Sequence, residues 1–165
     1  MTAIFRHLER FPSKNFRTNY SAEHKTFIAQ HIVNDIQHPL NGQRRREQQR
    51  RKQEGLWWHI TTSTDLSKSS VVRTWCRRRL HNAFADVLKK RGIDEYGRLV
   101  DAEALESSHR GLVMASKGRD DWILKGSFRF HALVPCIPAK YADLQKELGA
   151  LVDAMLKDAL QNSSK

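Results

Sequence analysis

The sequence is poor in the residues that build several common kinds of site. Its two cysteines, Cys76 and Cys136, lack the spacing of zinc ligands, and its eight histidines do not cluster. The eight glycines are scattered and form no phosphate-binding loop, and no Gly-x-Ser-x-Gly turn or repeated carboxylate motif is present. We therefore expect no catalytic residue and no metal site in this chain, and a binding protein rather than a catalyst.

Long apolar stretches are missing as well. No run of about eighteen apolar residues occurs, which excludes a membrane-spanning helix, and the N-terminus lacks the apolar core of a secretion signal. Two cysteines without metal-ligand spacing predict buried, reduced thiols and therefore an intracellular protein. Residues 1–22 carry four basic side chains against one acid, which fits a basic N-terminal arm and a mitochondrial presequence equally well. Mitochondrion, cytoplasm and nucleus all stay open as locations.

Positive charge is what the chain has in excess. The 165 residues include 29 lysines and arginines against 18 acids, a formal net charge of +11. Between residues 41 and 91 there are fourteen basic and four acidic side chains. Such a compact basic block predicts a polyanionic partner, because its binding releases counterions from phosphates. No long apolar face accompanies the block, so we predict nucleic acid rather than a membrane.

The most informative segment runs from Val71 to Phe84. Its apolar residues recur at helical spacing and form one row: Val72, Cys76, Leu80, Ala83 and, beyond the segment, Val87. A second row holds Arg73, Arg77 and His81, and Arg78 flanks it. Guanidinium groups held in a row on a rigid helix suit phosphate oxygens, so we predict that these four side chains bind RNA. The further candidates for RNA contact are Lys68, Arg44, Arg45, Arg46 and Trp58.

The remaining pattern predicts alternating strands and helices. Strand signals over 56–62 and 126–134 precede helices ending near residue 91 and near residue 160. We predict an α+β protein, a single small α/β sandwich whose basic helix and C-terminal helix pack on a short sheet. This domain covers residues 23–165, with a short helix at 26–36, a basic loop at 41–55 and an insertion at 93–125 that carries a short helix near 102–107. The basic segment has no apolar residue to bury, so it is either a disordered loop or a solvated helix.

One face of the predicted sheet stays without a helical layer. It would carry Trp57, His59, Arg129 and His131, because these residues alternate with the apolar positions of the two strands. Such a face can stack bases, and it can equally be covered by the N-terminal segment. Both readings fit the sequence.

The segment from Val71 to Phe84 resembles the signature helix of the bacterial-type ribonuclease P protein subunit, roughly A-V-x-R-N-x-x-K-R-x-x-R-E-x-F. Arg73 and Arg78 fall on the first R and the later R, Arg77 falls on the K, and Phe84 on the closing F. The preceding strand and the strand–helix ending are also similar in place and kind. The chain departs from the motif at Thr74, Trp75, His81 and Asn82, and the 93–125 insertion has no counterpart in the family.

The resemblance implies an accessory subunit of a ribonucleoprotein that matures the 5′ end of precursor tRNA. In that family the partner ribonuclease P RNA, with bound magnesium, performs the hydrolysis, so the protein itself needs no cofactor. Arg73, Arg77 and Arg78 would contact that RNA. A cleft beside the sheet would hold the 5′ leader of precursor tRNA, with Trp58, or Phe128 and Phe130, as sheet-face contacts.

Two other functions fit the same residues. The basic face could hold rRNA as a structural protein of a ribosome, in particular a mitochondrial one. The apolar stripe of the terminal helix could instead make the chain a protein–protein adaptor, although the sequence names no protein partner; this stripe comprises Leu144, Leu148, Leu151 and Met155.

Overall fold

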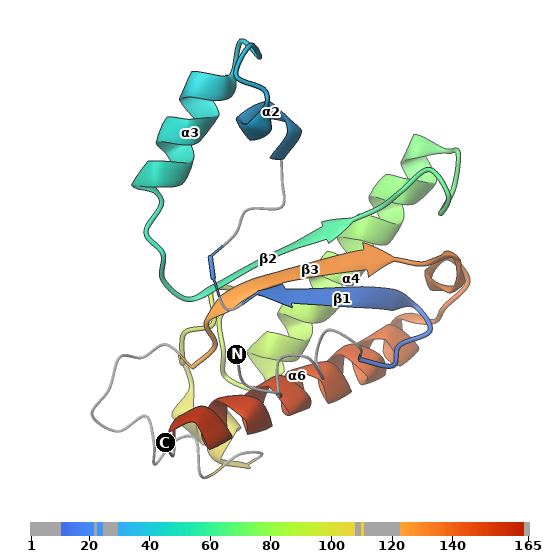
Figure 1. The fold of residues 1–165 in the computed structure, drawn as a ribbon. Coiled ribbons are helices and arrows are strands. Elements are labelled where there is room, and N and C mark those ends of the chain that lie inside the picture. Colours follow the sequence, from blue (N-terminus) through green and yellow to red (C-terminus); the bar gives the residue numbers. More distant parts are fainter. Residues whose placement is uncertain (1–10, 22, 25–29, 108–109, 111–122, 164–165) are drawn as a thin grey trace.

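Three strands form a mixed sheet in the order β1–β3–β2, with two long helices on one of its faces (Figure 1). The computed structural model describes residues 11–21, 23–24, 30–107, 110 and 123–163. Its elements are β1 (Phe16–Ser21), α2 (Gln30–Asn34), α3 (Asn41–Arg50), β2 (Leu56–Thr61), α4 (Ser70–Lys90), β3 (Gly126–Ala132), the 3-10 turn η1 (Val134–Cys136) and α6 (Tyr141–Ser163). A short helix covers residues 102–107. The predicted α+β sandwich with two helices packed on a short sheet is confirmed.

The central strand β3 pairs antiparallel with β1 and parallel with β2. In this register Phe16, Phe128 and Phe130 point to one face and are buried there together with Ile60. Helices α4 and α6 cover that face, which is therefore the core of the molecule (Figure 1). The alternate residues of all three strands lie on the opposite face, which carries no helical layer from α4 or α6.

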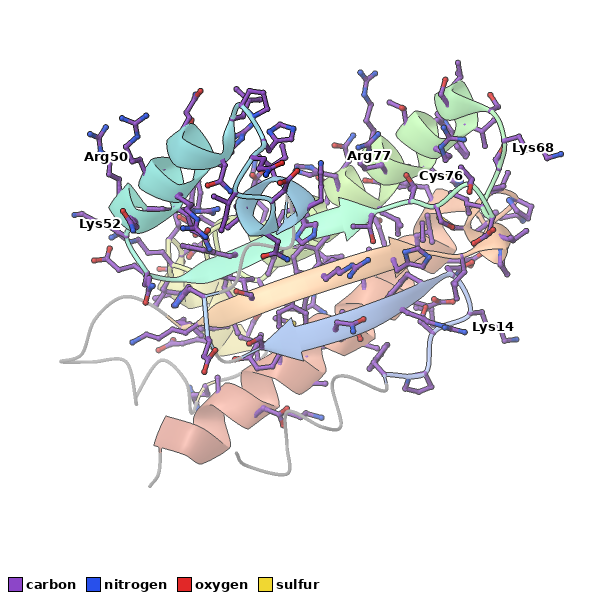
Figure 2. All side chains as sticks on the ribbon, turned by 45° about the horizontal axis from the view of Figure 1, so that its top comes forward. Lys14, Arg50, Lys52, Lys68, Cys76 and Arg77 are labelled. Atoms are coloured by element: carbon purple, nitrogen blue, oxygen red, sulfur yellow. The ribbon has the colours of Figure 1, made fainter. Side chains whose placement is uncertain are left out.

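The connection from β2 through α4 to β3 has an uncommon hand. Figure 2 looks onto the face of the sheet opposite α4 and α6, with β2 and β3 running in the same direction. Because α4 passes behind the sheet while the chain steps from the edge strand β2 to the central strand β3, the crossover is left-handed. Nearly all β-α-β units are right-handed, so the placement of α4 is a distinctive feature of this fold.

Helix α4 forms and ends where the sequence predicts. Its buried residues follow the predicted apolar row and add Phe84 and Leu88 to it. The helix ends at Lys90, and Gly92 just beyond it has a φ of +71°, the left-handed conformation that favours glycine. A Cβ atom at this position would lie 2.0 Å from the carbonyl oxygen of Asp101, so no other residue fits without moving the chain.

The apolar stripe of α6 is used inside the protein. Leu144, Leu148 and Leu151 are fully buried, Met155 nearly so, and α6 packs against α4. This stripe is therefore no docking surface, and the adaptor hypothesis built on it is wrong.

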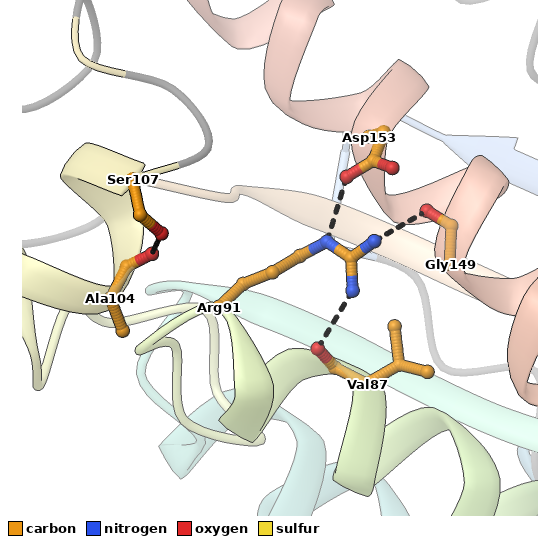
Figure 3. Close-up of polar contacts among 6 residues, drawn as sticks. All are labelled: Val87, Arg91, Ala104, Ser107, Gly149 and Asp153. Atoms are coloured by element: carbon orange, nitrogen blue, oxygen red, sulfur yellow. Dashed lines mark hydrogen bonds and ion pairs between the residues drawn. The ribbon is translucent and has the colours of Figure 1, made fainter.

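Arg91 joins the C-terminal end of α4 to the middle of α6 (Figure 3). Its guanidinium donates to the carboxylate of Asp153 at 2.7 Å, to the Gly149 carbonyl at 3.1 Å and to the Val87 carbonyl at 3.2 Å. The Arg91 side chain is only 16 % exposed, so this charge is satisfied within the protein. A residue counted in the basic block thus serves the fold rather than a ligand.

Two predicted boundaries need correction. Residues 16–21 form the edge strand β1, so the segment assigned to an N-terminal arm or presequence reaches into the sheet. Residues 41–50 form the helix α3 instead of a loop. Of the helix predicted at 26–36, residues 25–29 lie outside the described residues and α2 ends at Asn34, two residues earlier than predicted. The predictions for residues 1–10 and 111–122 also lie outside the described residues.

We expect Arg91→Met to lower the free energy of unfolding by about 2 kcal/mol, because it removes hydrogen bonds from a charged, largely buried donor. Urea denaturation of the purified protein measures this difference. Lys89→Met is the matched control, since it removes the same charge from an exposed position two residues away on α4. Equal midpoints for the two variants would contradict the role assigned to Arg91.

Candidate nucleic-acid interface

The arginines of α4 divide into an inner and an outer group. Arg73 is half-buried, and its guanidinium donates to the carbonyls of Ser67 at 2.6 Å and Lys68 at 2.8 Å, which holds the loop before the helix. Arg79 is also half-buried and donates to the carbonyl of Ala139 at the start of α6. Both guanidinium groups are thus engaged within the protein. Whether Arg73 also contacts RNA stays a prediction.

Arg77 and Arg78 form the outer group. Both are exposed, and Figure 2 shows Arg77 pointing away from the body of the protein. Arg77 has a single long hydrogen bond, 3.4 Å to the hydroxyl of Thr74, and Arg78 has no hydrogen bond or ion pair within the part of the chain that the structure describes. Two adjacent guanidinium groups on a well-packed helix therefore keep most of their donors available to a ligand.

His81 continues this surface toward β2. Its ring lies 4.6 Å from the ring of Trp58, which also packs edge-on against Phe84 at 4.7 Å. The indole N–H of Trp58 donates to the carbonyl of Glu95 at 2.7 Å. Trp58 is thus half-buried on the side of the sheet that α4 covers. Its ring is accessible beside α4 and not from the free face.

Two of the predicted sheet-face contacts are wrong. Phe128 and Phe130 are each 1 % exposed, because they point from β3 into the core beneath α4 and α6. The sequence shows which residues of a strand share a face, but the choice of face that is covered depends on the helices.

The other predicted arginines lie on α3. All residues of this helix except Asn41 are exposed, and none is apolar, so burial does not hold it in place. Arg44 pairs with Glu47 at 2.9 Å and Arg46 donates to the Gly42 carbonyl at 3.1 Å. Arg45 has no hydrogen bond or ion pair with any described residue. Helices α3 and α4 do not pack together. The arginines of α3 and the arginines of α4 therefore form two separate surfaces.

Asn41 joins α3 to α2. Its buried side-chain amide donates to the carbonyls of Ile32 at 2.7 Å, Val33 at 3.0 Å and Asp35 at 2.7 Å, at the end of α2. The last carbonyls of a helix have no N–H partner within that helix, so the asparagine satisfies such groups and closes the α2–α3 hairpin. The Asp35 carbonyl also accepts from the backbone N–H of His38 at 3.2 Å. In Figure 1 this hairpin stands apart from the layer formed by α4 and α6.

The hairpin is attached to the sheet at Trp57. The guanidinium of Arg51 lies 3.8 Å from the centre of the indole ring, and the ring of His24 meets it edge-on at 5.1 Å. His24 also bonds the carbonyl of Gly55 at 2.9 Å. Trp57 is consequently buried, so this end of the free face is covered by Arg51 and His24. Neither residue belongs to the N-terminal segment 1–22, so coverage of the face by that segment stays a prediction.

The rest of the free face is polar and cationic. The pairing of the strands places Arg17, His131 and Thr61 in one row and Asn19, Arg129 and His59 in the next. The hydroxyl of Thr61 is the shared partner of this network, at 3.1 Å from Nδ1 of His131 and 3.3 Å from Nε of Arg129. Sequence reasoning missed Arg17, because its strand was assigned to the terminal arm.

The two histidines of this face are neutral at neutral pH. Burial, and next the positive charge of Arg129, lower the pKa of His59 to about 4. Burial, Arg129 and Arg17 also lower the pKa of His131 from its usual value of 6.5. The positive charge of the face therefore comes from its arginines, while the imidazole rings supply planar surfaces and hydrogen-bonding nitrogens.

Comparisons with protein-family models, with curated proteins and with solved structures found no match for this chain. Within the described residues, no three His, Cys, Asp or Glu side chains form a group that could hold a metal ion. None of the helices in the same part of the chain is both long and apolar enough to span a bilayer. The likeness to the ribonuclease P subunit thus rests on the residues of α4 and the order of the elements.

We expect the stability of the protein to fall as the pH is lowered from about 6.5 toward 4. In this range the unfolded chain protonates His59 while the folded protein does not, because the folded pKa is about 4. The contribution of this group is complete above pH 6.5 and is lost as the pH falls. Urea denaturation at several pH values should show a shallower decline for His59→Gln, and parallel curves for the two proteins would refute this account.

Proposed function

We propose that this protein binds RNA through the outer surface of α4, as a noncatalytic subunit resembling the protein of ribonuclease P. The observation that carries the proposal is the pair of exposed guanidinium groups of Arg77 and Arg78. They stand on a helix that is fixed by a buried apolar row, by Arg79 and by Arg91. Donors that are held in place before binding lose little freedom when a phosphate reaches them.

The free face of the sheet supports RNA over double-stranded DNA as the partner. It combines the exposed guanidinium of Arg17 and the half-buried guanidinium of Arg129 with the half-buried, neutral rings of His59 and His131. A surface of cations and planar rings suits a single strand, whose backbone and unpaired bases are both accessible.

On this proposal the protein positions RNA and the hydrolysis belongs to a partner RNA with its magnesium. Arg77 and Arg78 would hold backbone phosphates of that RNA through paired N–H donors. Arg17 and Arg129 would hold the phosphates of a single-stranded 5′ leader of precursor tRNA on the free face. The chain itself would exchange no proton with the substrate.

A structural role on ribosomal RNA is the second candidate, and α3 is the observation that favours it. Its arginines project from a helix that buries no apolar surface, as expected of an extension that RNA surrounds. Gradient sedimentation of cell extract separates the two functions. Migration with a ribosomal subunit supports the ribosomal role, and migration with a lighter RNA particle supports the ribonuclease P role.

We expect the double variant Arg77→Ala and Arg78→Ala to bind precursor tRNA more weakly. The slope of log affinity against log salt concentration should become shallower by about 1 to 2, since each lost phosphate contact removes about 0.7 to 0.9. Fluorescence anisotropy over a range of salt concentrations measures both quantities.

Two further double variants serve as controls. Lys146→Ala with Lys157→Ala removes the same charge from exposed positions of α6 and should leave affinity and slope near those of the parent. Arg77→Lys with Arg78→Lys keeps the charge but loses the guanidinium fork, so it should lower affinity with little change in slope. If the two alanine pairs behaved alike, α4 would not be the contact surface.

A further inference from the structure

Trp75 is the one tryptophan of the described residues that is exposed rather than buried or half-buried. It is 47 % exposed on α4, whereas Trp57 is buried against Arg51 and His24, and Trp58 packs against Phe84. Aromatic side chains carry a large apolar surface, so leaving an indole in water forgoes a substantial gain from burial.

The exposed indole of Trp75 is held in place by a neighbouring arginine on the same helix. The guanidinium of Arg79 lies 4.7 Å from the centre of the ring, and Arg79 is itself fixed by its bond to the carbonyl of Ala139. The backbone of α4 is rigid here, because the next residue, Cys76, is buried in the core. A flat aromatic surface with few conformations available is prepared for stacking at low entropic cost.

A free guanidinium lies next to this ring. Arg78 follows Trp75 by three residues, which places the two Cβ atoms about 5–6 Å apart on the helix surface. Arg78 lies opposite the buried row of α4 and has no partner among the described residues. An aromatic face and a phosphate-binding fork side by side match the two parts of a nucleotide, its base and its phosphate.

We propose that Trp75 stacks on an unpaired base of the bound RNA, next to the phosphate held by Arg78. This inference rests on the proposed function and specifies the RNA further: the site on α4 needs a nucleotide outside a continuous duplex. Bases within a duplex have both faces occupied by their neighbours, so a helix of paired RNA alone would offer Trp75 no partner.

The test uses two labelled RNA hairpins whose stems are closed by a non-nucleotide linker, so that neither has an unpaired base in its loop. One has a single-stranded 5′ extension and the other has a blunt end. Their affinities are measured by fluorescence anisotropy for the full chain and for Trp75→Ala. Stacking on one base corresponds to about a 5- to 150-fold loss on truncation. We expect this loss for the extended hairpin only, with an unchanged salt slope, because stacking releases no counterions.

Two control variants show whether a loss of affinity comes from the missing indole or from misfolding. Trp75→Phe keeps an aromatic face and should retain most of the affinity. Val71→Ala shortens an apolar side chain that is 75 % exposed one turn earlier on the same helix, and it should bind both hairpins like the parent. Urea denaturation of each variant shows whether the fold is intact.

The outcomes separate this inference from the function on which it depends. An affinity of Trp75→Ala equal to that of the parent, beside a weakened Arg77 and Arg78 variant, would overturn the stacking proposal and leave RNA binding in place. An equal loss on both hairpins would also overturn it, because a blunt duplex has no extension to stack. If the parent bound neither hairpin at low salt, the proposed function would fail together with the inference.

Discussion

The contact between α4 and α6 is the constraint on which the rest of the structure depends. Both helices lie on the same face of a three-stranded sheet, and each buries its apolar row against the other and against the strands. Because α4 packs against both α6 and the sheet, only its remaining side is exposed to solvent. On α4 that side carries Trp75, Arg78 and the neighbouring polar residues, so the packing decides which side chains meet a ligand.

Contacts within the protein explain why so basic a chain does not expose all of its arginines. Arg73, Arg79 and Arg91 each donate to backbone carbonyls, and Arg91 also pairs with Asp153. Arg51 lies over an indole ring. These residues contribute to the count of positive charges, but their guanidinium groups stabilise loops and helix ends. A smaller outer set remains for phosphates, and it is divided between α4, α3 and the free face of the sheet.

Much of this fold is predictable from the sequence. The apolar rows of α4 and α6 have clear helical spacing, and β2 and β3 alternate over their whole length, so their bounds agree closely with the structure. The strand β1 was missed although Phe16, Thr18 and Tyr20 alternate with polar residues. Its short pattern lies beside the basic residues and the helical spacing of the preceding segment, which suggested an arm.

The candidate site was predictable in part, for a physical reason. Helical spacing separates the apolar row of α4 from its arginines, but it does not show that Arg73 lies against the loop while Arg78 faces water. That distinction arises from neighbours far apart in the chain, such as Ala139 for Arg79. The burial of Phe128 and Phe130 has the same origin, because either face of an alternating strand can be the covered one.

The order of the strands has a consequence for how the chain acquires its structure. β3 is the central strand of the sheet, yet it comes last, more than sixty residues after the end of β2. β1 and β2 do not pair with each other, so neither has a partner until the chain extends past residue 132. During synthesis the helices α3 and α4 can form from local contacts, while the aromatic strand β2 stays unpaired and open to aggregation. Assembly of the sheet is therefore a late, long-range event, and any chain that ends before β3 contains all the arginines of α4 without the sheet that orients them.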